Sequence, residues 1–386
     1  MGRAAWKTLQ MTPAELRSFF TAMVENWTGP GWDPTRLGFH ERLTPTLQPV
    51  PGFGYRRLHL CARQLYVLSR APALLGTAPS ARTEQVFRLL AERFHDDRHG
   101  GFFLSLDLDG APLDRRKDLY GHAFVLFGLA AYHAASGDPA ALTLARQSLA
   151  EIHQHLAMPG GWFAAIATED WTECDAALSQ NPHMHLLEAC LALEAVDADP
   201  AWCQTADALV DLFHRHLYDP AGQALGEFYD EAGRPHPETG HWVEPGHQFE
   251  WAWLLYAHAE RRGTTPPDAA DALIAQGARR GTDPLEGGLF DRIDRTGGIV
   301  AETKRIWPVC EAIKAYAIRW RRRGDPADRT AMLHWLGLLA THYLREGGRW
   351  HEHLNRDLTP LLSDMPGTTP YHLLMMGEEV LPSLTP

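Results

Sequence analysis

The sequence predicts an all-α protein, a closed (α/α)6 barrel of six helical pairs with short β-hairpins in the connecting loops. Three observations lead to this fold. Strongly apolar segments recur at a spacing of roughly 60 residues, an amphipathic segment precedes each one, and a glycine-rich motif lies between most of the pairs. An open stack of pairs is the alternative, but polar motifs at one end of every apolar segment favour closure around a shared cavity. We expect one domain over residues 1–386.

The apolar segments are predicted to form the inner helices of the barrel. Inner helices are apolar on most faces because the barrel wall and the neighbouring helices cover them. Each segment follows a short lead-in that is rich in glycine or proline. The segments begin near Gly54, Tyr120, Asn181, Gly246, Lys304 and Thr369.

The amphipathic segments are predicted to form the outer helices, because their charged residues recur at helical spacing. They lie near residues 12–27, 83–95, 138–156, 198–217, 267–280 and 326–345. In the first of them, Thr12 and Pro13 suit an N-cap and the first helical position. Among the inner segments, Asn181 and Thr369 are each followed by proline and suit N-caps in the same way.

The third recurring piece predicts short β-hairpins between the two helices of most units. It is a glycine-led group of four residues, followed by alternating polar and apolar residues and a turn such as 108–110. The groups lie at 100–103, 160–163, 226–229, 287–290 and 347–350. The first unit departs from the pattern, with Gly31-Trp32 and a proline-rich connection that runs to Pro51.

Composition argues against several classes of function. The formal net charge of −12 disfavours nucleic acid and anionic membrane surfaces as partners, because both attract basic proteins. The longest apolar run, near residues 122–135, is too short to span a bilayer, and no leading segment has the pattern of a signal peptide. The five cysteines are scattered and form no CxxC pair. This usage is typical of a reduced cytoplasmic protein, which is the location we expect.

Polar side chains gather at the starts of the predicted inner helices. His247 follows Pro245-Gly246 into a first helical turn, and Glu250 lies on the same helical face three residues later. An imidazole with a pKa of about 6.5 suits proton transfer near neutral pH, and we expect Glu250 to orient it. The other starts carry His122, His183, His185, Trp307 and His372. If the inner helices run parallel, these groups meet at one mouth of the barrel.

Two other chemistries remain open at this point. A metal site is one, because histidines are abundant at His183, His185, His247, His351, His353 and His372. However, the sequence has no HExxH or similar ligand spacing, and a pair such as His183 and His185 would face different sides of a helix. A glycosidase is the other, since Glu188, Glu250 and Glu311 could supply an acid and a base carboxylate. We expect no metal and no cofactor.

These motifs resemble those of the N-acylglucosamine 2-epimerase superfamily, whose members are (α/α)6 barrels that isomerise or epimerise aldoses. The resemblance runs through all the predicted inner helices. Its most specific parts are NPHMHLLEA at 181–189 and PGHQFEW at 245–251, supported by ARQLYVLSRA at 62–71, DLYGHAFVL at 118–126 and TPYHLL at 369–374. The RIWP sequence at 305–308 is similar to the mannose isomerase and sulfoquinovose isomerase branch, whereas cellobiose 2-epimerases tend to have paired tryptophans there.

The resemblance implies an aldose–ketose isomerase that interconverts D-mannose and D-fructose, with D-lyxose and D-xylulose as further candidates. The reaction would be a metal-independent proton transfer through a cis-enediolate. His247 and His372 would be the acid/base pair, Glu250 would orient His247, and Arg63 would hold the oxygens near the reacting carbons. The implied substrate-binding residues are Asn181, His185, Trp307, His122, Arg305, Glu188 and Glu311.

A mannose 2-epimerase would share almost every motif, and it is the main alternative. Return of the proton to C1 gives the ketose, whereas return to the opposite face of C2 gives the epimer. A glycoside hydrolase and a non-catalytic sugar-binding module are more distant alternatives. The set of histidines together with Glu250 and Arg63 favours an enzyme, because binding alone would not require it. We expect a monosaccharide substrate and a monomer or homodimer.

Overall fold

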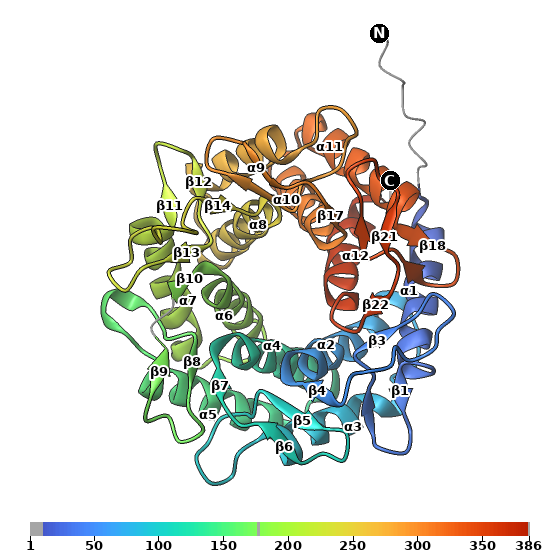
Figure 1. Ribbon diagram of the computed structural model, residues 1–386, viewed down its shortest axis with the longest axis vertical. Coiled ribbons are helices and arrows are strands. Elements are labelled where there is room, and N and C mark those ends of the chain that lie inside the picture. Colours follow the sequence, from blue (N-terminus) through green and yellow to red (C-terminus); the bar gives the residue numbers. More distant parts are fainter. Residues whose placement is uncertain (1–10, 176–177, 385–386) are drawn as a thin grey trace.

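The computed structural model describes residues 11–175 and 178–384. Within these residues the α-helices alternate between an inner and an outer ring (Figure 1). The inner ring consists of α2 (Leu58–Leu75), α4 (Leu119–Ser136), α6 (Gln180–Leu193), α8 (Pro245–Arg262), α10 (Trp307–Arg323) and α12 (Pro370–Leu384). The outer ring consists of α1 (Pro13–Thr28), α3 (Ala81–Leu89), α5 (Pro139–His155), α7 (Pro200–Leu212), α9 (Asp268–Gly281) and α11 (Pro326–Leu338). The predicted (α/α)6 barrel is therefore confirmed.

The burial of each ring follows its composition. In α4, every residue from Gly121 to Tyr132 is buried, as expected for a helix that neighbours cover on most faces. The outer helix α5 buries only one stripe, which includes Ala141, Ala145 and Ile152 at helical spacing. No helix among the described residues has the length and apolar character needed to cross a bilayer.

The last inner helix closes the ring against the first. Strand β22 (Met365–Pro366), which leads into α12, pairs antiparallel with β3 (Arg42–Leu43) near the start of the chain. Lower in the same seam, Arg70 of α2 donates from Nε to Oε1 of Glu378 in α12 at 2.7 Å. The ring is therefore closed, as the polar residues at the helix starts indicated, and the helical pairs do not form an open stack.

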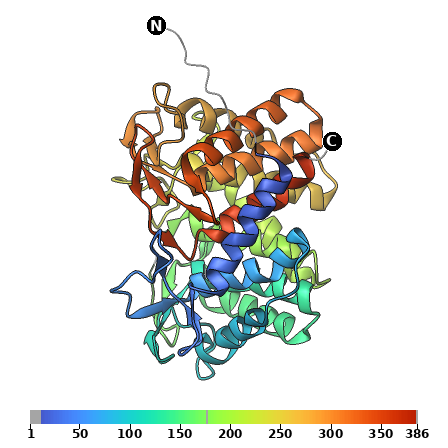
Figure 2. The ribbon, with the colours of Figure 1, turned by 90° about the vertical axis from the view of Figure 1, so that its right-hand side faces the viewer.

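The strands gather at one end of the barrel (Figure 2). Each three-stranded sheet joins a hairpin to a strand that leads into an inner helix, so the hairpins fix the positions of the helix starts. These sheets are β4 (Tyr55–Arg57) with β5 (Ser105–Asp107) and β6 (Pro112–Asp114); β7 (Lys117–Asp118) with β8 (Ile166–Ala167) and β9 (Cys174–Asp175); β14 (Trp242–Val243) with β15 (Arg292–Asp294) and β16 (Ile299–Ala301); and β17 (Lys304–Arg305) with β20 (His353–Leu354) and β21 (Pro360–Leu362).

The remaining strands form short pairs. They are β1 (Trp32–Asp33) with β2 (Gly38–Phe39), β10 (Leu178–Ser179) with β13 (Phe228–Tyr229), β11 (Tyr218–Asp219) with β12 (Ala224–Leu225), and β18 (Leu344–Arg345) with β19 (Arg349–Trp350). The β11–β12 hairpin closes before the group 226–229, with Gln223 in the left-handed region. The group itself opens a further short hairpin, as predicted, in which Tyr229 pairs with Pro235. Phe228 and Tyr229 also pair with the strand that leads into α6.

Two predicted N-caps have different outcomes. Thr12 caps α1 and forms a capping box with Glu15, as its sequence context predicts. Asn181 does not cap α6, because the helix begins at Gln180 and Ser179 takes the N-cap position. Pro182 is tolerated inside the first turn, where a backbone N–H would have no helical partner. Three outer helices also end in a wider π-helical turn that the sequence did not predict, at Leu90–Phe94, Phe213–Leu217 and Leu339–Tyr343.

Candidate active site

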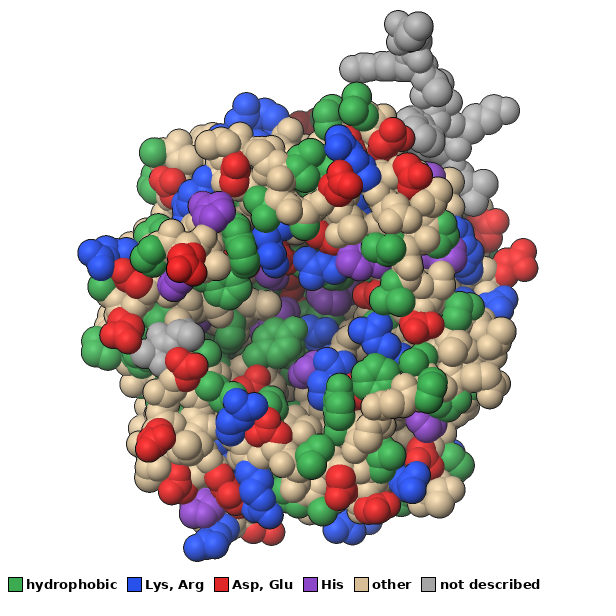
Figure 3. Space-filling model, in the orientation of Figure 1, with side chains coloured by type: hydrophobic (Ala, Val, Ile, Leu, Met, Phe, Trp, Pro, Cys, Tyr) green, Lys and Arg blue, Asp and Glu red, His purple; other side chains and the backbone are tan. Residues whose placement is uncertain are grey.

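The inner-helix starts meet at a cavity of about 460 Å³, as the sequence predicted. Figure 3 shows this hollow at the centre of the barrel end, with histidine and charged side chains around it. The predicted site residues that line it are Arg63, Asn181, His185, His247, Glu250, Arg305, Trp307 and His372. The lining also contains residues that were not predicted: Asp118, Tyr120, Ser179, Pro182, Glu227, Phe228 and Glu244.

His247 lies in the first turn of α8 and is 6% exposed. Its Nδ1 is 2.8 Å from Oε2 of Glu227 and 3.9 Å from Oε2 of Glu244. The bond at Nδ1 fixes the imidazole and leaves Nε2 for the cavity. The structure corrects the expectation that Glu250 orients His247. The Glu227 carboxylate holds the ring from a connecting segment, and Glu250 lies instead 3.8 Å from Nδ1 of His185.

His372, the other predicted acid/base residue, is held in the same way in the first turn of α12. Its Nδ1 is 2.8 Å from Oε1 of Glu311 in α10, which again leaves Nε2 for the cavity. The Trp307 ring contacts both imidazoles, with centroid distances of 4.9 Å to His247 and 5.7 Å to His372. A Cβ on Gly246 would lie 2.4 Å from this indole, so the close approach requires glycine in the PGHQFEW motif.

The two imidazoles differ in their proton affinity. Burial lowers the pKa of His372 to about 4, and the hydrogen bond with Glu311 offsets only part of this effect. Burial also disfavours the charged form of His247, but the nearby carboxylates of Glu227 and Glu244 outweigh it and raise the pKa of this imidazole. His372 is therefore neutral at neutral pH, whereas the carboxylates beside His247 shift the pKa of that imidazole toward its protonated form. Such divergence is typical of an acid and a base that work together.

Arg63 and His185 complete the polar wall on the side of α2 and α6. Arg63 donates from Nη2 to the Tyr120 hydroxyl at 2.6 Å, and its guanidinium lies 4.0 Å from the centroid of the Phe124 ring. His185 has its Nδ1 3.1 Å from Oε2 of Glu188, and burial lowers its pKa to about 4. Beside them, Oδ1 of Asn181 has no hydrogen-bond partner among the described residues, so it can accept one from a ligand.

A buried ionic cluster of Glu188, Glu250, Glu311 and Lys314 lies beneath the cavity. Nζ of the fully buried Lys314 is 2.7 Å from Oε2 of Glu311. Burial and repulsion by Glu311 raise the pKa of Glu250 well above its ordinary value, which favours the protonated form of this carboxyl. Glu188 and Glu311 do not line the cavity, which corrects their assignment as substrate-binding residues. They hold His185 and His372 from below.

His122 is also corrected, because both of its ring nitrogens have protein partners. Its Nδ1 bonds to the carbonyl of Asp118 at 2.7 Å, and Nε2 accepts the backbone N–H of Phe102 at 3.0 Å. It is fully buried and does not line the cavity. His183 makes the equivalent bond to the N–H of Phe163. These histidines tie a hairpin to an inner helix, and their first-turn position gave no means of distinguishing them from His247.

Glu227 is the most important residue that sequence reasoning missed, and a repeat-level signal for it exists. It lies two residues after Leu225, which ends strand β12 and pairs with Tyr218 of β11. The corresponding positions of other units also carry carboxylates: Glu41, Asp291 and Glu352. Glu41, Glu227 and Asp291 accept the backbone N–H of Arg57, Glu244 and Arg305, respectively, just before an inner helix. Alignment of the units on the last paired residue of each hairpin, which is Phe39, Leu225, Leu289 or Trp350, places these carboxylates at one position.

In the part of the chain that the structure describes, two groups of side chains have ligand atoms close enough to hold a metal ion. The atoms lie within 4.8 Å of one another in His185, Glu188 and Glu250, and in Glu250, Glu311 and His372. The Lys314 ammonium already neutralises the second group and would repel a divalent cation. In both groups the histidine Nδ1 is also held by a carboxylate. Metal-free chemistry stays a prediction, which chelation tests directly.

An (α/α)6 barrel with carboxylate-held imidazoles in one polar cavity is suited to acid–base chemistry on a small polar molecule. The model of the family "N-acylglucosamine 2-epimerase (GlcNAc 2-epimerase)" matches residues 38–376. A mannose-6-phosphate isomerase of Rhizobium meliloti is 32% identical over 363 residues, covering 92% of each chain. A D-mannose isomerase of Thermobifida fusca is 31% identical, covering 83% of this chain and 81% of the relative. The solved structure of the cellobiose 2-epimerase from Spirochaeta thermophila superposes with a TM-score of 0.85 at 26% identity, covering 98% of both chains.

The chain therefore belongs to the N-acylglucosamine 2-epimerase family. It is an enzyme of the sugar isomerase and epimerase class, as the resemblance in its helix-start motifs indicated.

Proposed function

We propose that this enzyme interconverts D-mannose and D-fructose by proton transfer between C2 and C1. The observation that carries the proposal is the pair His247 and His372. Each imidazole has its Nδ1 on a carboxylate, each contacts Trp307, and their pKa values move in opposite directions. An enolisation requires a base for the carbon-bound proton and an acid for oxygen, and two imidazoles whose proton affinities differ in this direction can supply both.

The reaction begins with the open-chain aldose. His372 is neutral near pH 7 and takes the proton from C2 at Nε2, while the electron pair of the C2–H bond forms the C1–C2 double bond. The C1 carbonyl oxygen takes up the negative charge, which gives the cis-enediolate. His372 then returns the proton to C1, and transfer of the O2 proton to O1 leaves a carbonyl at C2. The product is the ketose, with no net gain or loss of protons.

His247 serves the oxygens in this scheme. Because its pKa is raised, it can protonate the ring oxygen during opening and take the proton back on closure. Arg63 and Glu250 both line the cavity. Arg63 can donate hydrogen bonds to the developing oxyanion, and so can the protonated form of Glu250, which its raised pKa favours. Asn181, His185 and Arg305 would bind the remaining hydroxyls, and Trp307 would pack against the carbon face of the sugar.

A 2-epimerase is the second candidate, and the close structural match to a cellobiose 2-epimerase favours keeping it. Epimerisation needs a proton donor on the opposite face of C2. His372 and His247 contact one indole from different helices, so a second proton donor is present. The outcome depends on whether the enediolate is protonated faster at C1 or at C2.

Product analysis tests the proposal. The enzyme is incubated separately with D-mannose, D-glucose, D-fructose, D-lyxose and cellobiose, and the products are identified by ¹³C NMR. We expect D-fructose from D-mannose and the reverse reaction from D-fructose. Formation of D-glucose without fructose would identify a 2-epimerase, and the absence of any conversion would leave a sugar-binding protein.

A further inference from the structure

The rim of the sugar cavity carries a charged cluster centred on Glu244, the residue that precedes α8. Glu244 is 8% exposed. Its Oε1 accepts a hydrogen bond from Nη2 of Arg292 at 2.9 Å, and its Oε2 accepts one from Nη2 of Arg305 at 2.9 Å. Burial alone would raise the pKa of this carboxyl, but His247, Arg305 and Arg292 outweigh it and lower the pKa, so Glu244 is ionised at neutral pH.

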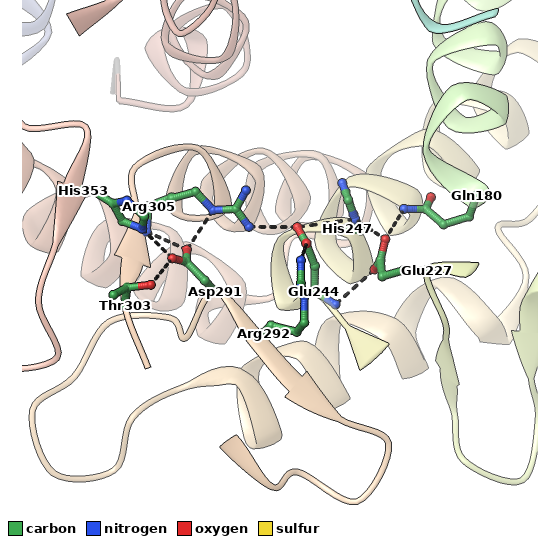
Figure 4. Close-up of polar contacts among 9 residues, drawn as sticks. All are labelled: Gln180, Glu227, Glu244, His247, Asp291, Arg292, Thr303, Arg305 and His353. Atoms are coloured by element: carbon green, nitrogen blue, oxygen red, sulfur yellow. Dashed lines mark hydrogen bonds and ion pairs between the residues drawn. The ribbon is translucent and has the colours of Figure 1, made fainter. Parts of the chain in front are cut away.

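Both arginines are committed to protein partners. Nε of Arg305 donates to Oδ1 of Asp291 at 3.0 Å, so two of its guanidinium nitrogens face carboxylates (Figure 4). Asp291 is in turn held by Thr303 at 2.6 Å and by His353. The guanidinium of Arg292 lies 4.3 Å from the centroid of the Trp242 ring. A ligand that needed either arginine would have to break these contacts.

The helix starts beside the cluster are also occupied. Backbone N–H groups before a helix are a natural site for a phosphate. Here the N–H of Glu244 donates to Oε1 of Glu227 at 3.0 Å, and that of Arg305 donates to Oδ1 of Asp291 at 2.8 Å. The protein's own carboxylates therefore take the places that a phosphate oxygen would use near α8 and α10.

The rest of the lining offers little to replace these two committed arginines. Glu227 and Asp118 add carboxyl groups to the cavity wall. Among the described residues that line the cavity, Arg63 is the only arginine or lysine apart from Arg305, and it bonds to the Tyr120 hydroxyl and packs on an aromatic ring. Recognition of a phosphate normally uses arginine or lysine side chains with donors aimed at the anion.

We propose that Glu244 makes this cavity selective for uncharged sugars over sugar phosphates, because it holds Arg305 and Arg292 in ion pairs and places a negative charge at the rim. The inference rests on the proposed function in that it concerns the sugar occupying that cavity. The expected preference for an uncharged sugar differs from the name of the Rhizobium meliloti relative, which is a mannose-6-phosphate isomerase.

The test compares two ligands in three proteins. Binding of D-mannose and of D-mannose 6-phosphate is measured by NMR titration for the wild type, Glu244→Gln and the control Glu260→Gln. The control removes one charge from the opposite end of the same helix. We expect the wild type to bind the phosphate about a hundredfold more weakly than mannose, because like charges across a recognition surface disfavour the wrong ligand. Glu244→Gln should reduce this ratio of mannose affinity to phosphate affinity by about tenfold or more, whereas Glu260→Gln should leave the ratio unchanged.

A double variant identifies the cation that Glu244 holds. Adding Arg305→Gln to Glu244→Gln should abolish the gain in phosphate binding. Melting temperature and helical circular dichroism establish that each variant is folded, and Glu244→Ala replaces Glu244→Gln if the latter is not. Wild-type binding of the phosphate as tight as that of mannose would overturn the inference, as would an unchanged ratio in Glu244→Gln. If the enzyme binds mannose but does not convert it, only the proposed isomerase function fails. The role of Glu244 is tested separately, because it depends on the ratio of the two binding affinities.

Discussion

Replacement of Glu227 by glutamine removes the carboxylate that holds His247 and keeps its size. Glu227 is 4% exposed, and its Oε2 is 2.8 Å from Nδ1 of the imidazole. At an effective dielectric constant of about 20, unit charges about 4 Å apart interact by about 4 kcal/mol. That energy corresponds to about three pH units of pKa. Because the glutamine oxygen can still accept the Nδ1 proton and Glu244 remains nearby, we expect the pKa of His247 to fall by about two pH units.

The direction of the activity change follows from the role of His247 as the acid. The raised pKa of His247 keeps it protonated at pH values below that pKa, so kcat/KM falls as pH rises through it. In Glu227→Gln this alkaline limb should move to lower pH, and activity at pH 7 should recover when the solution is made more acidic. The acidic limb, set by the pKa of about 4 of His372, should stay in place.

The assay pairs the pH profile of kcat/KM for D-mannose with an NMR titration of labelled histidine. The matched control is Glu41→Gln, which removes the carboxylate from the equivalent position of the first unit, where it accepts hydrogen bonds from the backbone N–H and from Nε of Arg57. This control should lower stability without moving the profile. An unchanged pKa of His247 in Glu227→Gln would refute the assignment of Glu227 as its positioning residue.

Three further predictions follow from the same contacts. His372→Gln and His247→Gln should each lower kcat by about 10²-fold or more with unchanged helical circular dichroism, and near-normal turnover in either would remove that residue from the mechanism. Treatment with EDTA should leave activity intact, whereas loss that added metal restores would establish a metal enzyme. His122→Leu should lower the free energy of unfolding by about 2 kcal/mol in urea titrations while kcat persists, since it orphans the buried N–H of Phe102. His122→Gln should be milder, because Gln248 already bonds the equivalent N–H of Leu225.

Repetition made the fold predictable from the sequence. The apolar inner segments and amphipathic outer segments recur, so an error at one boundary, such as the start of α6, does not disturb the count of helices. Convergence of the helix starts follows from closure of the ring, and this placed Arg63, His185, His247 and His372 around one cavity.

The partners of these residues were harder to predict because they come from the connections. Spacing on a helix predicted that Glu250 would orient His247. A carboxylate on a loop approaches from outside the helix, so helical periodicity does not reveal it. Glu227 and Glu244 belong to that kind. His185 and Glu188 have the same three-residue spacing and do meet, at 3.1 Å. The spacing permits a contact, and the three-dimensional neighbours decide whether it forms.

The histidines show the same limit in another form. His122, His183 and His247 all begin inner helices, yet the first two bond hairpin backbone and the third faces the cavity. These histidines differ in the protein groups that pack against each imidazole ring.

Conversion of D-mannose by the wild-type enzyme in D₂O tests the central claim most directly. If His372 carries the proton from C2 to C1, the proton can exchange with solvent while it resides on the imidazole. We predict D-fructose with deuterium at C1, detected by ¹H and ¹³C NMR. D-Fructose that forms without any deuterium at C1 would show that the transferred hydrogen never resides on a group that exchanges with solvent, and it would contradict the account.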